Sequence, residues 1–480
     1  MKLLHNLKKI YKKNINNIAL NYDNKKVTYH QFCTEVLNVS SFLKKKNAKK
    51  ICIVEGKNEE HYYYVFIFAS LLAGITYIPV SSNTPKLRIK DLLQISKPDL
   101  LISTRQYNFL KKLKIAFINP NKKIKIENDK KFKIVNTNKD AYIIFTSGST
   151  GKPKGVRISR KALDNYVEWL RKKIFNDKVI KCSQHPRIGF DLSVADIFGT
   201  ICSGGTLFPI KKNIDRVFLS KFINKNQLTH WISVPSLVDL IFLNTVNKRD
   251  KINSLKKVFF CGEILKKNHL KRIFKYNKKI KVINCYGPTE ATVSCTYQNF
   301  NYKNYKNLCK PTASIGVPIK GTYFTLRRIN SDKNIGELII SGNQVSSGYL
   351  GDMSQNKIKF IHRKKKRSFI TGDICKKFNN KYYFLNRLDR QTKILGNRIE
   401  MGEIDNRIEE ITKLNSYTLK VNDKLVTFID GDFSKYNLKN KLINYFHSNI
   451  IPNKILKIKK FPRNKNEKID ETKLLAKINL

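Results

Sequence analysis

Along most of the chain, hydrophobic and polar positions repeat either with the period of a helix or with the period of a strand. These two patterns predict where its helices and strands lie. Runs of β-branched and aromatic residues, such as Tyr142–Phe145, predict buried strands. Residues 18–29 predict a strand pair, and the spacing of apolar residues over 31–46 predicts an amphipathic helix. Further helices are predicted at 159–175, 195–202, 217–226 and 236–244. This alternation predicts an α/β fold, with helices on both faces of its sheets.

The run Tyr62–Val80 carries no charge and is nearly long enough to span a bilayer. Gly74 and Pro79 interrupt it, and Thr76-Tyr77-Ile78 has the composition of a strand. A buried helix that ends near Gly74, followed by a short buried strand, explains the same residues. We therefore expect a soluble protein without a membrane span.

The sequence of the second half of the chain predicts a small subdomain and a separate C-terminal domain. Residues 316–351 are richer in glycine, and apolar and polar residues alternate more often there. This pattern predicts a small, antiparallel, barrel-like subdomain. A domain boundary is predicted at Leu388-Asp389. We expect a large N-terminal domain at 1–388, built of layered α/β sheets together with that subdomain. A small, mobile α+β domain is expected at 389–480.

The composition is that of a globular protein, with 41% hydrophobic and 11% aromatic residues, but the charge is extreme. Subtracting 36 acidic from 94 basic residues gives +58. One interpretation is binding to nucleic acid or an anionic membrane. The basic residues are scattered, however, and no tail or helix concentrates them. We therefore favour a lysine-rich composition spread over the whole chain, and expect no nucleic-acid partner.

Nine cysteines are widely separated and form no C-x-x-C pair, so the sequence suggests neither a zinc site nor a redox motif. Several lie in apolar runs, as Cys261 does in Val258-Phe259-Phe260-Cys261, where cysteine acts as a small core residue. An odd number of cysteines fits a reducing compartment better than a disulfide framework. We expect a cytoplasmic protein.

A loop of small and hydroxylated residues, TSGSTGKPKG at 146–155, directly follows the strand at 142–145. Small residues let the backbone wrap an anion, and hydroxyl and amide groups can donate hydrogen bonds to phosphate oxygens. The loop is not a P-loop, because Pro153 stands where that motif requires Ser or Thr, and no G-x-G-x-x-G occurs. Its full pattern indicates another kind of nucleotide-phosphate site.

Two further motifs accompany this loop, Tyr286-Gly287-Pro288-Thr289-Glu290 and Thr371-Gly372-Asp373. Together the three segments resemble the adenylate-forming superfamily, which includes acyl-CoA synthetases, luciferases and the adenylation domains of nonribosomal peptide synthetases. The resemblance extends from Ala73–Pro79 (AGITYIP) to Lys468 and so covers nearly the whole chain. It implies that a carboxylate attacks the α-phosphate of ATP, releasing pyrophosphate and leaving an acyl-adenylate.

The same resemblance implies which residues bind the nucleotide. Asn284 and Tyr286 would lie against adenine. Asp373 would accept hydrogen bonds from the ribose hydroxyls, and Arg387 would lie near the ribose and phosphate. The loop residues that would hold the β- and γ-phosphates are Thr146, Ser147, Gly148, Ser149, Thr150, Gly151 and Lys154.

Catalytic roles also follow from the resemblance. Thr289 would donate to the α-phosphate, and Glu290 would hold Mg²⁺, a hard cation that suits carboxylate and phosphate oxygens. Lys468 matches the lysine that stabilises the carboxylate and the developing phosphorane, although Glu467 replaces the family's usual glycine. Asp389 falls at the family's hinge, about which the small domain rotates between adenylation and thioester formation.

Asp191, in Phe190-Asp191-Leu192-Ser193-Val194, matches the aspartate that amino-acid-activating members place against the substrate ammonium. The alternative is an aspartate that caps a helix beginning near Ser193. Phe260-Cys261-Gly262-Glu263 further resembles D-alanine:D-alanyl carrier protein ligases, in which that cysteine helps to favour the D form. The other lining residues that this resemblance implies are small or medium: Leu192, Ala195, Cys285, Val293 and Ser294. A hydrophobic pocket discriminates by only about 1–3 kcal/mol per methylene, so these residues do not fix one substrate.

The sequence therefore predicts an ATP-dependent ligase that adenylates a small amino acid, with D-alanine as the first candidate. The acyl group would pass to the phosphopantetheine thiol of a separate carrier protein. Two alternatives stay open. One is an acyl-CoA ligase for a carboxylic acid without an amino group; the other is a basic nucleic-acid-binding protein that keeps the fold without catalysis.

Overall fold

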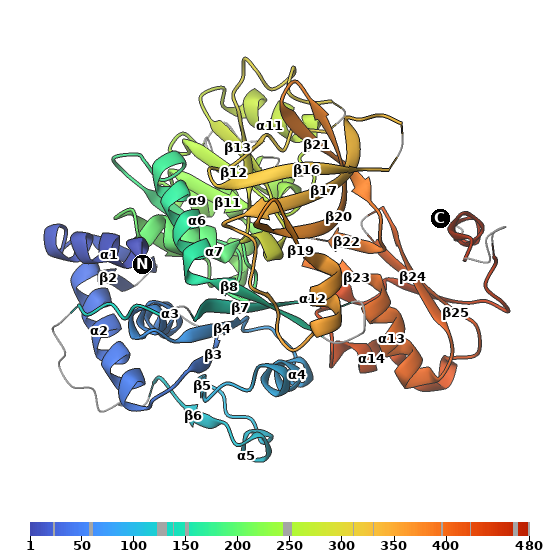
Figure 1. Ribbon diagram of the computed structural model, residues 1–480, viewed down its shortest axis with the longest axis horizontal. Coiled ribbons are helices and arrows are strands. Elements are labelled where there is room, and N and C mark those ends of the chain that lie inside the picture. Colours follow the sequence, from blue (N-terminus) through green and yellow to red (C-terminus); the bar gives the residue numbers. More distant parts are fainter. Residues whose placement is uncertain are drawn as a thin grey trace. The chain divides into compact units, whose positions relative to one another are not determined.

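The computed structural model describes residues 1–22, 25–56, 61–121, 132–137, 139–148, 153–242, 252–310, 312–329, 331–394, 397–422, 424–463 and 469–478 (Figure 1). The chain divides into two compact units. The large unit contains residues 1–82, 93–145 and 155–388. The small unit contains residues 389–480 together with two segments from the first half of the chain, 83–92 and 146–154. The division at Leu388 and Asp389 lies where the sequence predicts a boundary, and those two segments depart from the predicted ranges.

The first sheet has seven strands and includes the strand that leads into the phosphate loop (Figure 1). Its order is β18-β8-β7-β4-β3-β5-β6, and the strands from β7 to β6 pair in parallel, as an α/β fold predicts. The strands are β3 (Lys50–Val54), β4 (Thr76–Val80), β5 (Leu100–Ile102), β6 (Ala116–Ile118), β7 (Asp140–Thr146), β8 (Lys154–Ser159) and β18 (Gly348–Tyr349).

The second sheet has nine strands, in the order β15-β14-β13-β12-β11-β9-β10-β1-β2. Its interior, from β13 to β1, is parallel, and its edge strands are antiparallel. The strands are β1 (Ile18–Tyr22), β2 (Lys25–Thr28), β9 (Lys181–Gln184), β10 (Thr206–Pro209), β11 (His230–Ser233), β12 (Lys257–Phe260), β13 (Lys281–Tyr286), β14 (Thr296–Phe300) and β15 (Val317–Pro318). The pair β1–β2 confirms the strand pair predicted at 18–29; Asp23 and Asn24 lie outside the described residues.

The third sheet confirms the predicted antiparallel region. Its order is β16-β17-β20-β19, with β21 also paired to β20, and the described pairings do not close it into a barrel. The strands are β16 (Thr322–Arg328), β17 (Ile335–Gly342), β19 (Phe360–Arg363), β20 (Lys366–Phe378) and β21 (Lys381–Arg387).

The described α-helices before residue 388 are α1 (Lys2–Lys13), α2 (Tyr29–Lys45), α3 (Tyr62–Ala73), α4 (Lys86–Ser96), α5 (Leu110–Leu113), α6 (Arg160–Lys173), α7 (Ser193–Ile201), α8 (Asn213–Val217), α9 (Leu219–Lys225), α10 (Val238–Phe242), α11 (Lys267–Tyr276) and α12 (Met353–Lys359). Local sequence explains several of their ends. The Thr28 hydroxyl accepts from the amide of Gln31, and the Gln31 side chain accepts from the amide of Thr28, which starts α2. Ser159 caps α6 through the amide of Ala162.

The uncharged run Tyr62–Val80 folds as α3 followed by β4. The helix ends at Gly74, whose φ of +79° glycine adopts at little cost. None of the described helices combines the length and the hydrophobicity that a membrane span requires.

The helix predicted at 217–226 is present as α9 (Leu219–Lys225), and it starts two residues later than predicted. Phe218 (φ −104°, ψ 61°) separates α9 from the preceding short helix α8. The α8 helix closes at Phe218, whose amide donates to the carbonyl of Ile214 at 2.9 Å. Leu219 then begins a new helix with its side chain buried.

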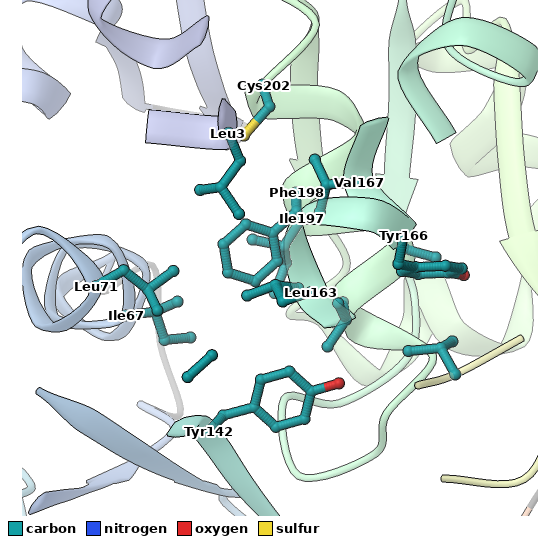
Figure 2. Packing of buried hydrophobic residues seen from close by; sticks show 14 of the residues in the cluster. Leu3, Ile67, Leu71, Tyr142, Leu163, Tyr166, Val167, Ile197, Phe198 and Cys202 are labelled. Atoms are coloured by element: carbon teal, nitrogen blue, oxygen red, sulfur yellow. The ribbon is translucent and has the colours of Figure 1, made fainter. Parts of the chain in front are cut away.

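The main hydrophobic core fills the space between α3, α6 and α7 (Figure 2). Figure 2 shows Ile67 and Leu71 of α3 facing Phe198 of α7, with Leu163 of α6 beside them. All four side chains are at most 2% exposed. Burying each large apolar side chain contributes roughly 1.5–3 kcal/mol, so this packing fixes the positions of α6 and α7.

The small unit is α+β, as predicted for 389–480. It holds a hairpin of β22 (Gln391–Ile394) and β23 (Asn397–Glu400), and a sheet in the order β24-β25-β26. Two hydrophobic clusters lie within it, one of which packs α13 against α14. Its remaining elements are α13 (Met401–Thr412), β24 (Ser416–Val421), β25 (Lys424–Ile429), α14 (Leu438–Ile443), β26 (Lys454–Lys457) and α15 (Glu471–Leu475).

Candidate active site

Asp191 and Thr289 lie next to each other in the large unit. The hydroxyl Oγ1 of Thr289 donates to Oδ2 of Asp191 at 2.6 Å, and both residues are 8% exposed. Asp191 stands in the turn before α7, and Thr289 opens a short 3₁₀ helix at 289–291. The N-cap of α7 is Leu192, without a side-chain capping hydrogen bond, so the alternative in which Asp191 caps this helix is wrong. Asp191 instead faces the second motif.

The sulfur-containing candidates gather around Tyr166, a fully buried residue of α6 that the sequence analysis did not select. Its hydroxyl accepts a hydrogen bond from Oγ of Ser294 at 3.1 Å. Burial raises the pKa of Tyr166, and Cys285, Cys261 and Asp191 lie close enough to raise it further. The phenol therefore stays protonated near neutral pH.

Val293 belongs to the same group, because Sγ of Cys261 donates to its carbonyl at 3.8 Å. Cys261 and Val293 are 4% and 2% exposed. Burial raises the pKa of the Cys285 thiol, so this cysteine is neutral too. The structure therefore brings together the four residues predicted to bind the substrate. All nine cysteines of the chain are free.

Tyr142 adds a second buried phenol. Figure 2 shows its hydroxyl pointing away from Ile67 and Leu71. This hydroxyl has no hydrogen-bond partner among the described residues. Burial raises the pKa of Tyr142, and Tyr77 and Asp191 raise it further, so the phenol is neutral and lies near Asp191.

The pleat of β13 places two predicted nucleotide residues on one face of the strand and a predicted substrate residue on the other. Asn284 and Tyr286 are two positions apart and so lie on one face of this strand, whereas Cys285 lies on the other. The pleat therefore separates the nucleotide candidates from a substrate candidate. Asn284 is 3% exposed; its Nδ2 donates to the carbonyl of Ser314 at 2.9 Å, and its Oδ1 has no partner in the described part of the chain. A buried acceptor without a partner is costly, so this amide suits an amino group of a bound base.

Asp373 is the centre of the second nucleotide group. It is 5% exposed and accepts hydrogen bonds from the Tyr286 hydroxyl at 2.5 Å and from Nη1 of Arg387. Asp373 and Arg387 are paired residues of β20 and β21, which explains their contact. Burial raises the pKa of Tyr286, and the neighbouring charge of Asp373 raises it further. The phenol therefore keeps its proton and remains a hydrogen-bond donor. Hydrogen bonds thus bring together three of the four predicted nucleotide residues, Tyr286, Asp373 and Arg387.

Glu290 is 1% exposed, and a residue that sequence reasoning missed contacts it. The hydroxyl of Tyr349 donates to Oε1 of Glu290 at 2.7 Å. Tyr349 reaches this position because β18 pairs with β8, where Tyr349 lies opposite Val156. No sequence signal could have found it, since the pairing depends on the tertiary fold.

The phosphate loop is described only at its ends. Thr146 ends β7 and Lys154 begins β8, while Ser149, Thr150 and Gly151 lie outside the described residues. Ser147 and Gly148 belong, like these ends, to the small unit. In that unit, Oγ of Ser147 donates to the carbonyl of Arg398 at 2.7 Å and accepts from the amide of Glu400 at 3.2 Å.

Two further candidates belong to the small unit. Asp389 is its first residue after the boundary, and its Oδ1 accepts from the amide of Gln391 at 3.3 Å. Lys468, the predicted catalytic lysine, lies outside the described residues, as does Glu467. Among the residues that the structure describes, no cluster of three or more His, Cys, Asp or Glu side chains could hold a metal ion.

The fold is similar to that of solved adenylation domains. The structure superimposes on the Vibrio cholerae adenylation domain AlmE in complex with glycyl-adenosine-5'-phosphate, with a TM-score of 0.84, 23% identity and coverage of 99% and 98% of the two chains. It also matches holo-PA1221, a nonribosomal peptide synthetase protein containing adenylation and PCP domains, with a TM-score of 0.85 and 19% identity. That match covers 100% of this chain and 84% of the other. These likenesses confirm the mixed α/β fold.

The family model for AMP-binding enzymes matches residues 7–350, and the chain belongs to this family. It is 29% identical over 483 residues to the D-alanine--D-alanyl carrier protein ligase of Staphylococcus aureus strain MRSA252, and the match covers 97% of each chain. The ligase of strain Newman matches to the same extent. The chain is therefore an AMP-forming ligase that uses ATP, and the predicted resemblance to adenylate-forming enzymes is confirmed.

Proposed function

We propose that this ligase adenylates a small amino acid, with D-alanine the first candidate, and transfers it to the phosphopantetheine thiol of a separate carrier protein. The contact between Thr289 and Asp191 carries the proposal, because it places the amine-binding candidate beside the α-phosphate candidate. The buried carboxylate of Asp191 lies near the neutral phenols of Tyr142 and Tyr166. This environment suits a substrate ammonium, which would offset the cost of burying the carboxylate charge. The D-alanine ligases among the relatives support the choice of amino acid.

In the proposed complex, Asn284 accepts from the adenine amino group and Tyr286 packs beside the base. Asp373 accepts from the ribose hydroxyls, and Arg387 holds the carboxylate of Asp373 in place. The loop from Thr146 to Lys154 holds the β- and γ-phosphates. Lys468 stabilises the attacking carboxylate and the phosphorane, and Asp389 is the hinge.

Glu290 is the proposed ligand of Mg²⁺. Its carboxylate is buried and held by Tyr349, which suits a fixed oxygen ligand for a hard cation. Because the described residues contain no larger acidic cluster around it, nucleotide phosphates and water would supply the other ligands. When bound, Mg²⁺ would neutralise charge on the phosphates. Glu290 itself orients the ion, and Thr289 donates to the α-phosphate.

Adenylation is tested by ATP–pyrophosphate exchange with purified full-length protein. The panel contains D-alanine, L-alanine, glycine, D-serine and two carboxylates without an amino group, acetate and propionate. We expect the fastest exchange with D-alanine or another small amino acid. Exchange with no amino acid would overturn the proposal, and exchange with acetate or propionate that survives Asp191→Ala would favour the acyl-CoA ligase.

The acceptor needs a second assay. We expect radiolabelled D-alanine to appear as a thioester on a phosphopantetheinylated D-alanyl carrier protein. The carrier without the phosphopantetheine arm is the matched control. Labelling of coenzyme A in preference to the carrier would contradict this half of the proposal. A reaction on ATP and a thiol, together with nine free cysteines, supports a cytoplasmic location.

A further inference from the structure

The loop between β17 and β18 contains a buried glutamine, Gln344, that belongs to none of the motifs. Gln344 is 1% exposed. Its Nε2 donates to the carbonyl of Ser294 at 3.3 Å, and its backbone carbonyl accepts from Oγ1 of Thr292 at 2.7 Å. Its Oε1 accepts from Oγ1 of Thr322, the first residue of β16, at 3.2 Å. Gln344 therefore holds the segment Thr292–Ser294 at both ends and ties it to a separate sheet.

Val293, between these two attachment points, has a strained backbone. Its φ is +67°, and that of Thr292 is +57°. The amide of Ser294 donates to the carbonyl of Thr292 at 2.8 Å, which makes Val293 the centre of a three-residue turn. A turn of this kind with positive φ at its centre is the rare and strained form of the γ-turn. Positive φ is also unusual for a β-branched residue, so surrounding contacts must hold the turn.

Two of those contacts belong to the proposed amino-acid site. Sγ of Cys261 donates to the carbonyl of Val293, and Oγ of Ser294 donates to the hydroxyl of Tyr166. On another side, a Cβ on Gly287 would lie 2.6 Å from Cα of Ser294, so the turn packs directly on the backbone of the Tyr286–Glu290 motif. The position of the turn therefore determines where Val293 and Ser294, which form one wall of the proposed amino-acid site, lie.

We propose that Gln344 is a specificity-determining positioning residue, which holds the γ-turn at Val293 and thereby fixes how large an amino-acid side chain the site accepts. The inference rests on the proposed function, in which Val293 and Cys261 contact the amino acid. Apolar contacts discriminate by only about 10–200-fold per methylene, and they do so only where the wall cannot move. Without the amide of Gln344, the strained turn relaxes toward ordinary backbone angles, and the wall yields to larger side chains.

The test compares two variants of the full chain. Gln344→Leu removes Nε2 and Oε1 but keeps the size of the side chain and the backbone carbonyl that accepts from Thr292. Thr322→Val is the matched control, because it breaks the hydrogen bond at the other end of Gln344 and leaves Ser294 bonded. ATP–pyrophosphate exchange is measured with D-alanine and with D-valine, and the KM for ATP and the thermal midpoint are measured for each variant.

We expect Gln344→Leu to reduce the preference for D-alanine over D-valine by about tenfold or more, with the KM for ATP within about twofold of wild type. Thr322→Val should keep the preference for D-alanine over D-valine within about twofold of wild type. We expect this even if its thermal midpoint falls as far as that of Gln344→Leu. Equal preference in all three proteins would overturn the inference, because Gln344 would then be structural only.

Amide hydrogen exchange separates this inference from the proposed function. A peptide covering 288–297 should exchange about tenfold faster in Gln344→Leu than in Thr322→Val. Equal exchange would overturn the bracing role. If the wild-type protein activates no amino acid at all, the proposed function fails and the specificity role fails with it, whereas the exchange result still decides whether Gln344 holds the turn.

Discussion

Thr289 donates a hydrogen bond to Asp191 across 98 positions of sequence, with 2.6 Å between Oγ1 and Oδ2. The resemblance to adenylate-forming enzymes implies separate roles for these residues, Thr289 at the α-phosphate and Asp191 at the substrate ammonium. Because both are buried, the hydrogen bond forms in an environment where it is stronger than in water. The two halves of the proposed reaction are therefore linked by a single side-chain contact.

We expect Thr289→Val to lower kcat/KM for adenylation about 10–100-fold, since hydrogen bonds to charged groups contribute roughly 1.5–3 kcal/mol. Valine keeps the shape of threonine but leaves the carboxylate of Asp191 without this donor. Thr289→Ser keeps the hydroxyl and should retain most of the activity. Exchange kinetics at varied amino acid measure the effect, and a valine variant as active as the serine variant would contradict it.

Asp373→Asn should raise the KM for ATP about tenfold or more, because an amide group replaces an acceptor that already faces Arg387 and Tyr286. The KM for the amino acid should change much less. Asp332→Asn is the control, since Asp332 is a partly exposed aspartate of the same large unit, with 38% of its side chain accessible. The expectation fails if both variants have the same KM for ATP.

Tyr349→Phe removes the hydroxyl that lies 2.7 Å from Oε1 of Glu290 and keeps the ring. Side chains that orient a metal ligand typically change metal affinity about 10–100-fold, so we expect the Mg²⁺ requirement for nucleotide binding to rise about tenfold. Calorimetric titration of a non-hydrolysable ATP analogue at several Mg²⁺ concentrations measures this without turnover. Tyr323→Phe, at a tyrosine that is 50% exposed, is the control. An unchanged Mg²⁺ dependence would show that Tyr349 does not orient Glu290.

Asp405 of α13 gives the small unit a pH dependence. It is 5% exposed, and its Oδ2 pairs with Nη2 of Arg390 at 3.0 Å. Burial raises the pKa of Asp405 to about 6, although Arg390 lowers it in part. An unfolded aspartate has a pKa of about 3.9, so the folded protein binds more protons between these two values. The free energy of unfolding therefore falls as the pH rises through this window.

Asp405→Asn should remove that fall. We expect the difference in free energy of unfolding between wild type and variant to change by about 2–3 kcal/mol between roughly pH 4 and 6. Chemical denaturation monitored across this range measures it. Parallel curves for the two proteins would contradict the assignment.

Much of the fold could be read from local sequence. Gly74 ends α3, Ser159 caps α6, and the strand at β7 leads into the phosphate loop, as their residue types predict. The break at Phe218 could not be predicted, because no Gly or Pro marks it in the sequence. The residues of each motif could be recognised for the same reason as the helices, because both are encoded in short, contiguous runs of sequence.

The sequence by itself determined that the chain is an adenylate-forming enzyme, since a short phosphate loop and the motifs at 286–290 and 371–373 keep their residue types in contiguous runs. Only the tertiary structure decided which side chains support them. Tyr349 reaches Glu290 through the pairing of β18 with β8, and Tyr166 reaches Ser294 from a helix that precedes it by more than a hundred positions. Gln344 donates to Ser294 and accepts from Thr292, the two neighbours of Val293. Such contacts leave no pattern in the sequence, because they depend on how separate sheets and helices pack.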